Sequence, residues 1–145
     1  MRNIGISCVA ALLVVVFSGA AWSQQTAAAP AEENYQGVPF RSGGVGRDER
    51  EALERASGGY NLKLIFARKQ HTAFVSDVQV RITDSQGNVV LDGLSHGPWF
   101  FTRLPPGKYR VEAAIAGRTQ EQPVEVKEAA QARLAYYWDI EPDPT

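Results

Sequence analysis

A two-residue alternation of apolar and polar side chains runs through the second half of the chain and constrains its fold more than any other feature. In residues 60–67, Leu62 and Leu64 occupy one face of an extended chain, and Asn61 and Lys63 occupy the other. Strict alternation is typical of half-buried strands in antiparallel sheets, which have one face on the core and one face in water. The pattern therefore predicts an all-β protein. The same alternation returns in 77–84, 108–115, 122–126 and 133–139.

Turn residues separate these segments at the places where a chain of short strands must reverse. Residues 84–88 (Asp-Ser-Gln-Gly-Asn) are typical of a hairpin turn in which Gly87 adopts a positive φ. Residues 105–108 (Pro-Pro-Gly-Lys) favour a type II turn with Gly107 in the left-handed position, and residues 116–118 mark another reversal. About seven short strands with turns between them predict a β-sandwich.

One short α-helix is predicted before these strands, over residues 47–58. Asp48 and Glu49 fall in its first turn, where negative charge is favourable for the helix dipole, and the glycines at 58 and 59 are a stop signal. A helix of this length is marginal by itself, so its thin apolar stripe must dock on the domain. We expect the β-sandwich domain at 59–140 and a short tail at 141–145.

The N-terminal residues have the three parts of a secretory signal peptide. A positive start is followed by an apolar run over residues 4–17, and Ser23 occupies the last position before a cut at Gln24. The alternative is an uncleaved anchor, but the run is shorter than the roughly 20 apolar residues that span a membrane. We therefore predict a signal peptide at 1–23. Residues 24–46 are rich in Ala, Gln, Glu, Pro and Gly and are predicted to form a flexible tether.

Charge and cysteine content restrict the partners and the compartment. The formal net charge is −1 at pH 7, which argues against nucleic acid because phosphates require a basic footprint. The only cysteine is Cys8, inside the leader, so the exported chain has no thiol, disulfide or cysteine metal site. A chain without cysteine suits an oxidising periplasm. We expect a periplasmic or secreted protein without stable membrane insertion after the leader is removed.

Two stretches of the sequence resemble a known family. Residues 77–93 (DVQVRITDSQGNVVLDG) and 97–117 (GPWFFTRLPPGKYRVEAAIAG) are similar to carboxypeptidase regulatory-like domains. The leader, residues 43–50 (GGVGRDER) and residues 60–67 (YNLKLIFA) look like those of small exported proteobacterial proteins that contain this domain. The resemblance implies a transthyretin-like (prealbumin-like) fold, which is a seven-stranded antiparallel Greek-key β-sandwich, here preceded by one short helix. In that family the domain is an accessory unit without catalytic residues. The resemblance therefore implies no enzyme and no active-site positions.

Few residues suggest catalysis or metal binding. His71 and His96 are the two histidines, and no His-x-x-x-His or similar spacing identifies them as metal ligands. Ser95 and His96 are neighbours in sequence, but a nucleophilic serine needs its base close in space, and no Gly-x-Ser-x-Gly motif is present. We expect no cofactor and no metal. A hydrolase that uses His71 or His96 remains the third hypothesis.

The aromatic residues are the best candidates for binding. Residues 99–101 (Trp-Phe-Phe) and 136–138 (Tyr-Tyr-Trp) are consecutive, so strand alternation directs their rings to both faces of a sheet. Trp99, Phe100 and Tyr137 are the candidate ligand-binding residues, although the helix and the N-terminal segment are an alternative cover for them. The leading hypothesis is a non-catalytic binding module of the bacterial envelope, whose partner is a protein or a glycan. A carbohydrate-binding module with stacking aromatics is the second hypothesis.

Overall fold

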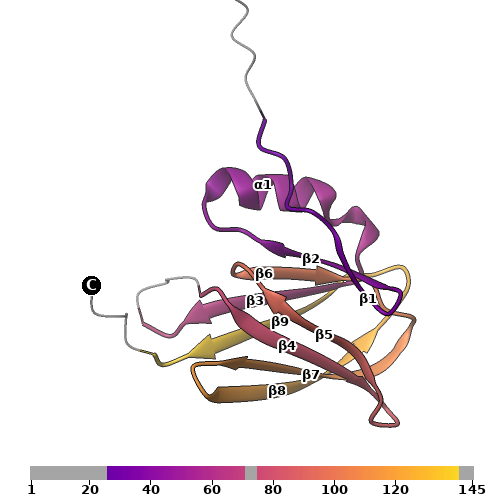
Figure 1. The fold of residues 1–145 in the computed structure, drawn as a ribbon. Coiled ribbons are helices and arrows are strands. Elements are labelled where there is room, and N and C mark those ends of the chain that lie inside the picture. The colour runs from indigo at the N-terminus through magenta and orange to yellow at the C-terminus, as the bar shows by residue number, and fades with distance from the viewer. Residues whose placement is uncertain (1–25, 71–74, 141–145) are drawn as a thin grey trace, which may run out of the picture.

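The computed structural model describes residues 26–70 and 75–140, which form two packed β-sheets and one α-helix (Figure 1). The first sheet has five strands in the order β1-β2-β6-β3-β9, and the second has four in the order β5-β4-β7-β8. In chain order the elements are β1 (Glu33–Tyr35), β2 (Val38–Gly43), α1 (Arg47–Ala56), the 3-10 turn η1 (Ser57–Gly59), β3 (Leu62–Arg68), β4 (Val78–Asp84), β5 (Val89–Ser95), β6 (Trp99–Thr102), β7 (Gly107–Ile115), β8 (Arg118–Val126) and β9 (Ala132–Trp138).

Some predicted features lie outside the described residues. They are the signal peptide at 1–23 with its cut between Ser23 and Gln24, His71, and the tail at 141–145.

The prediction of a mostly β protein with two sheets and one short helix is confirmed, but the strand number is corrected. The described residues form nine strands rather than the predicted seven. The additional strands, β1 and β2, lie within the stretch 24–46 that was predicted to be a flexible tether. Gln36 and Gly37, with φ of 47° and 89°, form the two-residue turn between them. Phe40 of β2 then stacks on Phe100 with a centroid distance of 5.3 Å, so one aromatic anchor holds this segment on the domain.

One strand pair is parallel, which corrects the expectation of an entirely antiparallel sandwich. β9 runs parallel to β3, with Leu62 opposite Ala132 and Arg68 opposite Trp138. The other strand pairs of the described chain are antiparallel. The chain crosses from the four-stranded to the five-stranded sheet between β8 and β9. Side-chain alternation has the same period in both orientations, so the sequence pattern does not indicate strand direction.

The turns agree with the sequence at two of three places. Gly87 has a φ of 82° in the β4–β5 turn, and Ala116 and Gly117 have φ of 48° and 73° in the β7–β8 turn. Gly107 was predicted to be left-handed, but it is the first residue of β7 and does not have a positive φ. The Tyr109 hydroxyl donates to the Pro105 carbonyl at 2.6 Å. This hydrogen bond connects the start of β7 to the residues before it and so stabilises the turn between β6 and β7.

The space between the sheets is filled by inward-facing side chains from both of them. Tyr136 of β9 donates its hydroxyl proton to the Val111 carbonyl of β7 at 2.7 Å, which joins the two sheets by a hydrogen bond. Burial raises the pKa of the Tyr136 phenol. The buried core consists of Phe40, Leu62, Leu64, Phe66, Val75, Val78, Val80, Ile82, Leu91, Phe100, Leu104, Tyr109, Val111, Ala113, Val126, Tyr136 and Trp138.

Helix α1 lies on the outer face of the five-stranded sheet, on the side away from the four-stranded sheet (Figure 1). Leu53 of the helix packs against Tyr60 and Phe101, and the three residues form a second, smaller apolar cluster. Asn61 and Lys63, expected on a solvated strand face, are buried. Lys63 lies beneath the helix and donates to Glu54, whereas the Asn61 side-chain amide exchanges two hydrogen bonds with the backbone of Leu104. Within residues 26–70 and 75–140 no helix has the length and apolar content needed to span a membrane.

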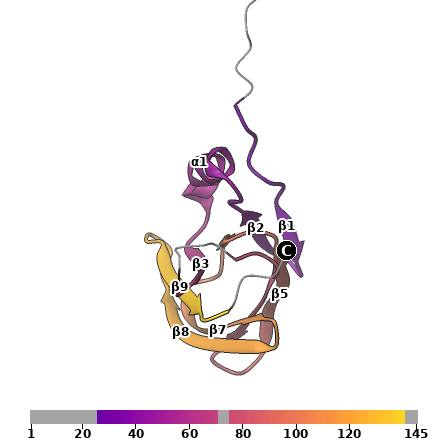
Figure 2. The same ribbon diagram turned by 90° about the vertical axis from the view of Figure 1, so that its left-hand side faces the viewer.

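The two sheets approach each other at both lateral margins, where β8 lies beside β9 and β5 lies beside β1 (Figure 2). At the first margin Gln120 and Gln122 donate from their side-chain amides to the backbone carbonyls of Tyr137 at 2.7 Å and Ala135 at 2.8 Å. At the second margin Gly93 lies against an aromatic ring of β2, and a Cβ atom there would lie 3.0 Å from that ring. Side chains therefore occupy both margins of the sandwich.

Candidate functional site

An apolar strip crosses the part of the five-stranded sheet that helix α1 leaves partly exposed. Ile65 of β3 lies directly opposite Trp99 of β6 and Ala135 of β9, and Tyr137 follows on the same face of β9. Trp99, Ile65 and Ala135 are half-buried, and Tyr137 is 50% exposed. We call these four residues the aromatic strip. Large aromatic residues that keep apolar surface in water are candidates for contact with a partner.

The indole of Trp99 is held from below by a buried lysine. Lys63 Nζ lies 3.7 Å from the centroid of the Trp99 ring and donates to Glu54 Oε2 at 3.0 Å. The Lys63 side chain is only 3% exposed, so its charge is compensated mainly by the Glu54 carboxylate of α1 and by the ring quadrupole. Phe101 meets Trp99 edge-on with a centroid distance of 6.3 Å. Trp99 is thereby fixed in position, and the ammonium group occupies one face of its ring.

Tyr137 projects from a strand whose outer margin is itself held in place. Its backbone carbonyl and that of Ala135 accept hydrogen bonds from Gln120 and Gln122 of β8. On the opposite side of β9, the Trp138 carbonyl accepts a hydrogen bond from the backbone N–H that follows β3 at 2.9 Å. The strand is bonded on both sides, so the phenol ring is presented from a rigid backbone.

Phe100, the third predicted binding residue, lies in the core instead. Its side chain is fully buried, it stacks on Phe40, and it lies opposite Leu64 of β3 on the inner face of the sheet. Alternation separates Phe100 from its neighbours Trp99 and Phe101, which face outward. The structure therefore brings two of the three predicted residues, Trp99 and Tyr137, to one face and removes the third from any ligand.

Sequence reasoning did not identify Ile65 and Ala135 as surface residues of the strip. Ile65 lies in a strand whose residues are mostly buried, and Ala135 carries little hydropathy signal by itself. Their grouping depends on the register of β3 with β6 and β9. Because β3 and β9 are about 70 residues apart in the chain, no local pattern reports that register.

The structure does not pair Ser95 with His96 as a nucleophile and its base. Ser95 is fully buried and donates its hydroxyl proton to the Gly97 carbonyl at 2.8 Å. His96 is exposed, and its Nε2 atom lies 3.9 Å from Glu33 Oε1. Among residues 26–70 and 75–140 no group of three or more His, Cys, Asp or Glu side chains is placed to hold a metal ion.

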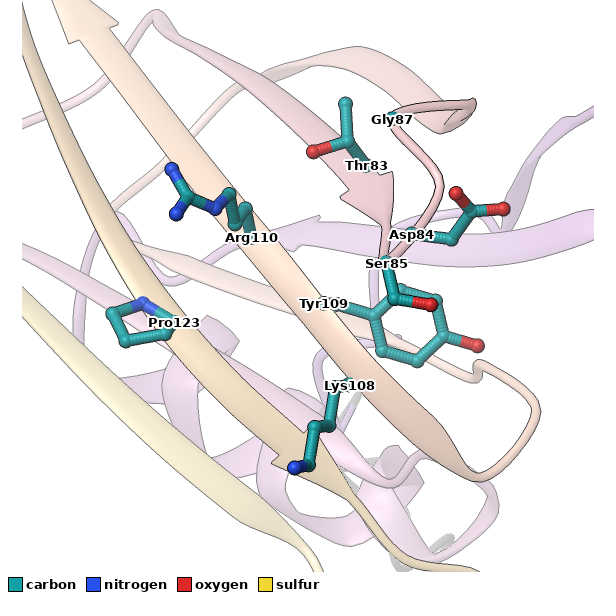
Figure 3. A pocket seen from close by; sticks show the side chains of 8 residues that line it. All are labelled: Thr83, Asp84, Ser85, Gly87, Lys108, Tyr109, Arg110 and Pro123. Carbon is teal, nitrogen blue, oxygen red and sulfur yellow. The ribbon is translucent and has the colours of Figure 1, made fainter.

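A second concave surface lies on the four-stranded sheet, at the β4–β5 turn (Figure 3). Its volume is about 360 Å³, and most of its charged groups already have partners. Arg110 donates to Glu121 at 2.6 Å, and Asp84 accepts from the backbone N–H groups of Gln86 and Asn88. The hydrogen bond from Asn88 lowers the pKa of Asp84 the most. The hollow is lined by Thr83, Asp84, Ser85, Gly87, Lys108, Tyr109, Arg110 and Pro123.

These charges stabilise the turn and the sheet surface, so the hollow is a weaker candidate than the aromatic strip. No protein-family model matches the chain, and neither a curated protein nor a solved structure matches it. The fold and the aromatic strip define a mostly β protein, in which two packed sheets carry this partly exposed strip beside helix α1.

Proposed function

We propose that the protein is a non-catalytic, exported interaction module of the bacterial envelope, and that a protein partner docks on the aromatic strip. The observation that carries this proposal is the 50% exposure of Tyr137 at the end of a continuous, half-buried apolar row. Protein interfaces are enriched in aromatic anchors held in fixed positions. Lys63 holds the ring of Trp99, and Gln120 holds the backbone of Tyr137, so the strip loses little backbone ordering entropy when a partner binds.

Strand order and sequence resemblance together favour the transthyretin-like Greek-key sandwich of carboxypeptidase regulatory-like domains as the framework. The strands that follow α1 supply all of the four-stranded sheet and three strands of the other. This count equals the seven strands that the resemblance implies. The hairpin β1–β2 and the helix are then additions that cover part of one sheet. As an accessory unit, such a domain acts by binding and needs no cofactor.

The periplasm is the proposed compartment. This assignment depends on the signal peptide expected at 1–23, with its cut between Ser23 and Gln24, and on the absence of cysteine after Cys8. Free thiols are oxidised in the periplasm, so a chain without cysteine suits that compartment.

The test is photo-crosslinking in the native cell from a benzophenone amino acid placed at Tyr137. The matched control carries the same probe at Glu125, which is exposed on β8 of the other sheet and lies outside the hollow. A discrete protein adduct is expected from position 137 and none from position 125. The adduct should disappear when Ala135→Glu places a charge in the middle of the strip. Equal adducts from both positions, or none from position 137, contradict the proposal.

A carbohydrate ligand is the second candidate, supported by the exposed ring of Tyr137. The burial of Phe100 and the occupied ring face of Trp99 leave fewer stacking platforms than the sequence suggested. Titration with envelope glycans, followed by the fluorescence of Trp99 in a Trp138→Phe background, tests this candidate. A saturable change at millimolar sugar that is lost in Tyr137→Ala favours the glycan, and no change favours the protein partner.

A further inference from the structure

Two cations share one carboxylate at the side of the aromatic strip. Arg133 lies on the same face of β9 as Ala135 and Tyr137, and its side chain is 60% exposed. The Glu54 carboxylate of α1 lies 3.9 Å from this guanidinium and already accepts the hydrogen bond from the buried Lys63 at 3.0 Å. One negative charge is thus shared by two positive charges, and the exposed member of the pair is the guanidinium.

The other end of the strip also carries more positive than negative groups. Lys69 follows β3 two residues after Ala67, which lies directly opposite Tyr137. Lys69 is exposed and forms no ion pair with a carboxylate of the described residues. Arg118 donates to the backbone carbonyl of Asp139 at 2.5 Å, so its guanidinium lies near this end as well. The exposed carboxylate of Asp139 balances one of these two cations.

The apolar residues of the strip lie between the two positive ends. Arg133 is opposite Lys63 in the parallel register, and Lys69 is six residues farther along the chain. At about 3.3 Å per residue, the two ends are about 20 Å apart along the strands. Ile65 and Tyr137 lie within this interval. The whole chain has a formal net charge of −1, so the surplus of positive charge is a local property of this face.

We propose that the partner of the aromatic strip is an acidic segment of another protein, with apolar side chains between two carboxylates that pair with Arg133 and Lys69. This inference rests on the proposed docking function and adds the chemistry of the partner. Apolar contact at the centre of an interface supplies affinity, and charges at its rim select the partner and accelerate encounter. On one face of an extended segment, side chains repeat every second residue, so the two carboxylates belong about six residues apart.

A nucleic acid or an anionic lipid surface fits this face less well. Such ligands present continuous negative charge and are bound by contiguous cations. Here the carboxylates of Glu54 and Asp139 interrupt the cations and would repel such a ligand. A protein segment with separate carboxylates can place them on the cations and keep them away from both acidic groups.

The probe is the synthetic peptide acetyl-Glu-Thr-Leu-Thr-Leu-Thr-Glu-amide, which carries two carboxylates and two leucines on one face at the required spacing. The matched peptide has lysine in place of both glutamates. Binding to the ¹⁵N-labelled exported protein is followed through the indole N–H resonance of Trp99, with that of the buried Trp138 as internal reference. The acidic peptide should bind at least about tenfold more tightly than the lysine peptide, and added sodium chloride should weaken its binding.

Charge variants test the residues directly. Arg133→Glu should abolish the preference for the acidic peptide, and Arg133→Lys should retain it because the charge is kept. Lys108→Glu makes the same change in net charge on the four-stranded sheet and should leave the preference unchanged.

Four results would overturn the proposal. They are equal or tighter binding of the lysine peptide, no saturable Trp99 shift up to about 10 mM acidic peptide, and an unchanged preference in a folded Arg133→Glu variant. The fourth is a dimer of the free protein in sedimentation equilibrium that Arg133→Glu dissociates, because a second copy of the chain would then be the occupant. Binding to phosphatidylglycerol vesicles without binding to the acidic peptide would favour a lipid surface instead.

The crosslinking probe at Tyr137 separates this inference from the docking proposal. If the cellular adduct forms in the native chain and persists in Arg133→Glu, a partner docks on the strip but is not selected by its acidic charge. If no adduct forms from position 137, docking itself is wrong, and the inference about the partner falls with it.

Discussion

The Nζ atom of Lys63 lies 3.7 Å from the centroid of the Trp99 ring, beneath the only α-helix of the described chain. Lys63 comes from β3 and Trp99 from β6, and both lie on the outer face of the five-stranded sheet. Glu54 of α1 completes the contact with a hydrogen bond of 3.0 Å. The arrangement connects the helix to the sheet and positions the aromatic strip at the same time.

Glu54→Gln should destabilise the protein because it leaves the buried Lys63 ammonium without its charged partner. We expect the free energy of unfolding to fall by about 1–2 kcal/mol, a range that allows for the half-exposed position of Glu54. Lys63→Met should cost little, since an apolar side chain of similar length replaces a buried charge. Urea denaturation of the double variant is the decisive measurement. If Glu54→Gln is equally costly in the Lys63→Met background, the pair is not the cause.

Phe100→Ala and Tyr137→Ala should have opposite profiles although both remove an aromatic ring from the sheet. The buried Phe100 ring fills space beside Phe40, so its loss should cost about 3–5 kcal/mol. Tyr137 is half exposed, so its loss should cost less than about 1 kcal/mol while it abolishes partner capture. Thermal unfolding and crosslinking yield are measured for both variants. A larger loss of stability in Tyr137→Ala than in Phe100→Ala would contradict the prediction.

Gln120 and Gln122 should protect the edge of β9 as well as stabilise it. Replacement of both by Ala removes two side-chain hydrogen bonds to β9 carbonyls, at about 1 kcal/mol each. The freed edge then has backbone groups that can pair with another chain. We expect faster amide exchange in β9 and concentration-dependent association in light scattering. Gln79→Ala, on the outer face of the other sheet, is the control and should leave the protein monodisperse.

Ala116→Asn should stabilise the β7–β8 hairpin. Ala116 has a φ of 48° in a two-residue turn, a conformation that alanine adopts at a cost and that asparagine tolerates. The expected gain is about 0.5–1 kcal/mol in the free energy of unfolding. The same change at Ala114, within the extended strand β7, should give no gain. A loss of stability at position 116 would contradict the assigned backbone conformation.

The protein should lose stability as the pH rises above the ordinary pKa of tyrosine. Burial raises the pKa of Tyr136, so the folded state keeps a proton that the unfolded state releases above about pH 10. The unfolded state then binds fewer protons, and the free energy of unfolding decreases with pH in that range. Tyr136→Phe should be less stable at neutral pH, because the Val111 carbonyl loses its partner, but should show a flatter decline. Chemical denaturation at several pH values between neutral and strongly alkaline compares the two slopes.

The part of the fold that could be predicted is the part encoded by short-range pattern. The alternation around Leu62, Val80 and Val111 identified strands whose inward residues are indeed buried. The hairpin at Gly87 followed from a turn motif of five residues, and its φ of 82° agrees. The hairpin at Gln36-Gly37 was not predicted, because the composition around it resembles that of a linker. The glycine at position 37 is nevertheless a turn signal.

The candidate site was predictable only in part. The consecutive aromatic residues at 99–101 showed that both faces of one strand would carry rings, but the phase that buries Phe100 and exposes Trp99 is decided by pairing with β2 and β3. Likewise, the polar residues Asn61 and Lys63 suggested a wet face, but the docked helix covers Lys63 and the backbone of Leu104 pairs with the Asn61 amide.

By itself the sequence determined the strand-rich character of the chain, its helix and most of its turns, because these depend on interactions between residues close in the chain. Tertiary structure alone decided that β9 lies parallel to β3, that β1 and β2 join the sheet, and that Trp99 and Tyr137 share one face. These outcomes depend on register and on packing between segments far apart in the chain, which a period of two cannot encode.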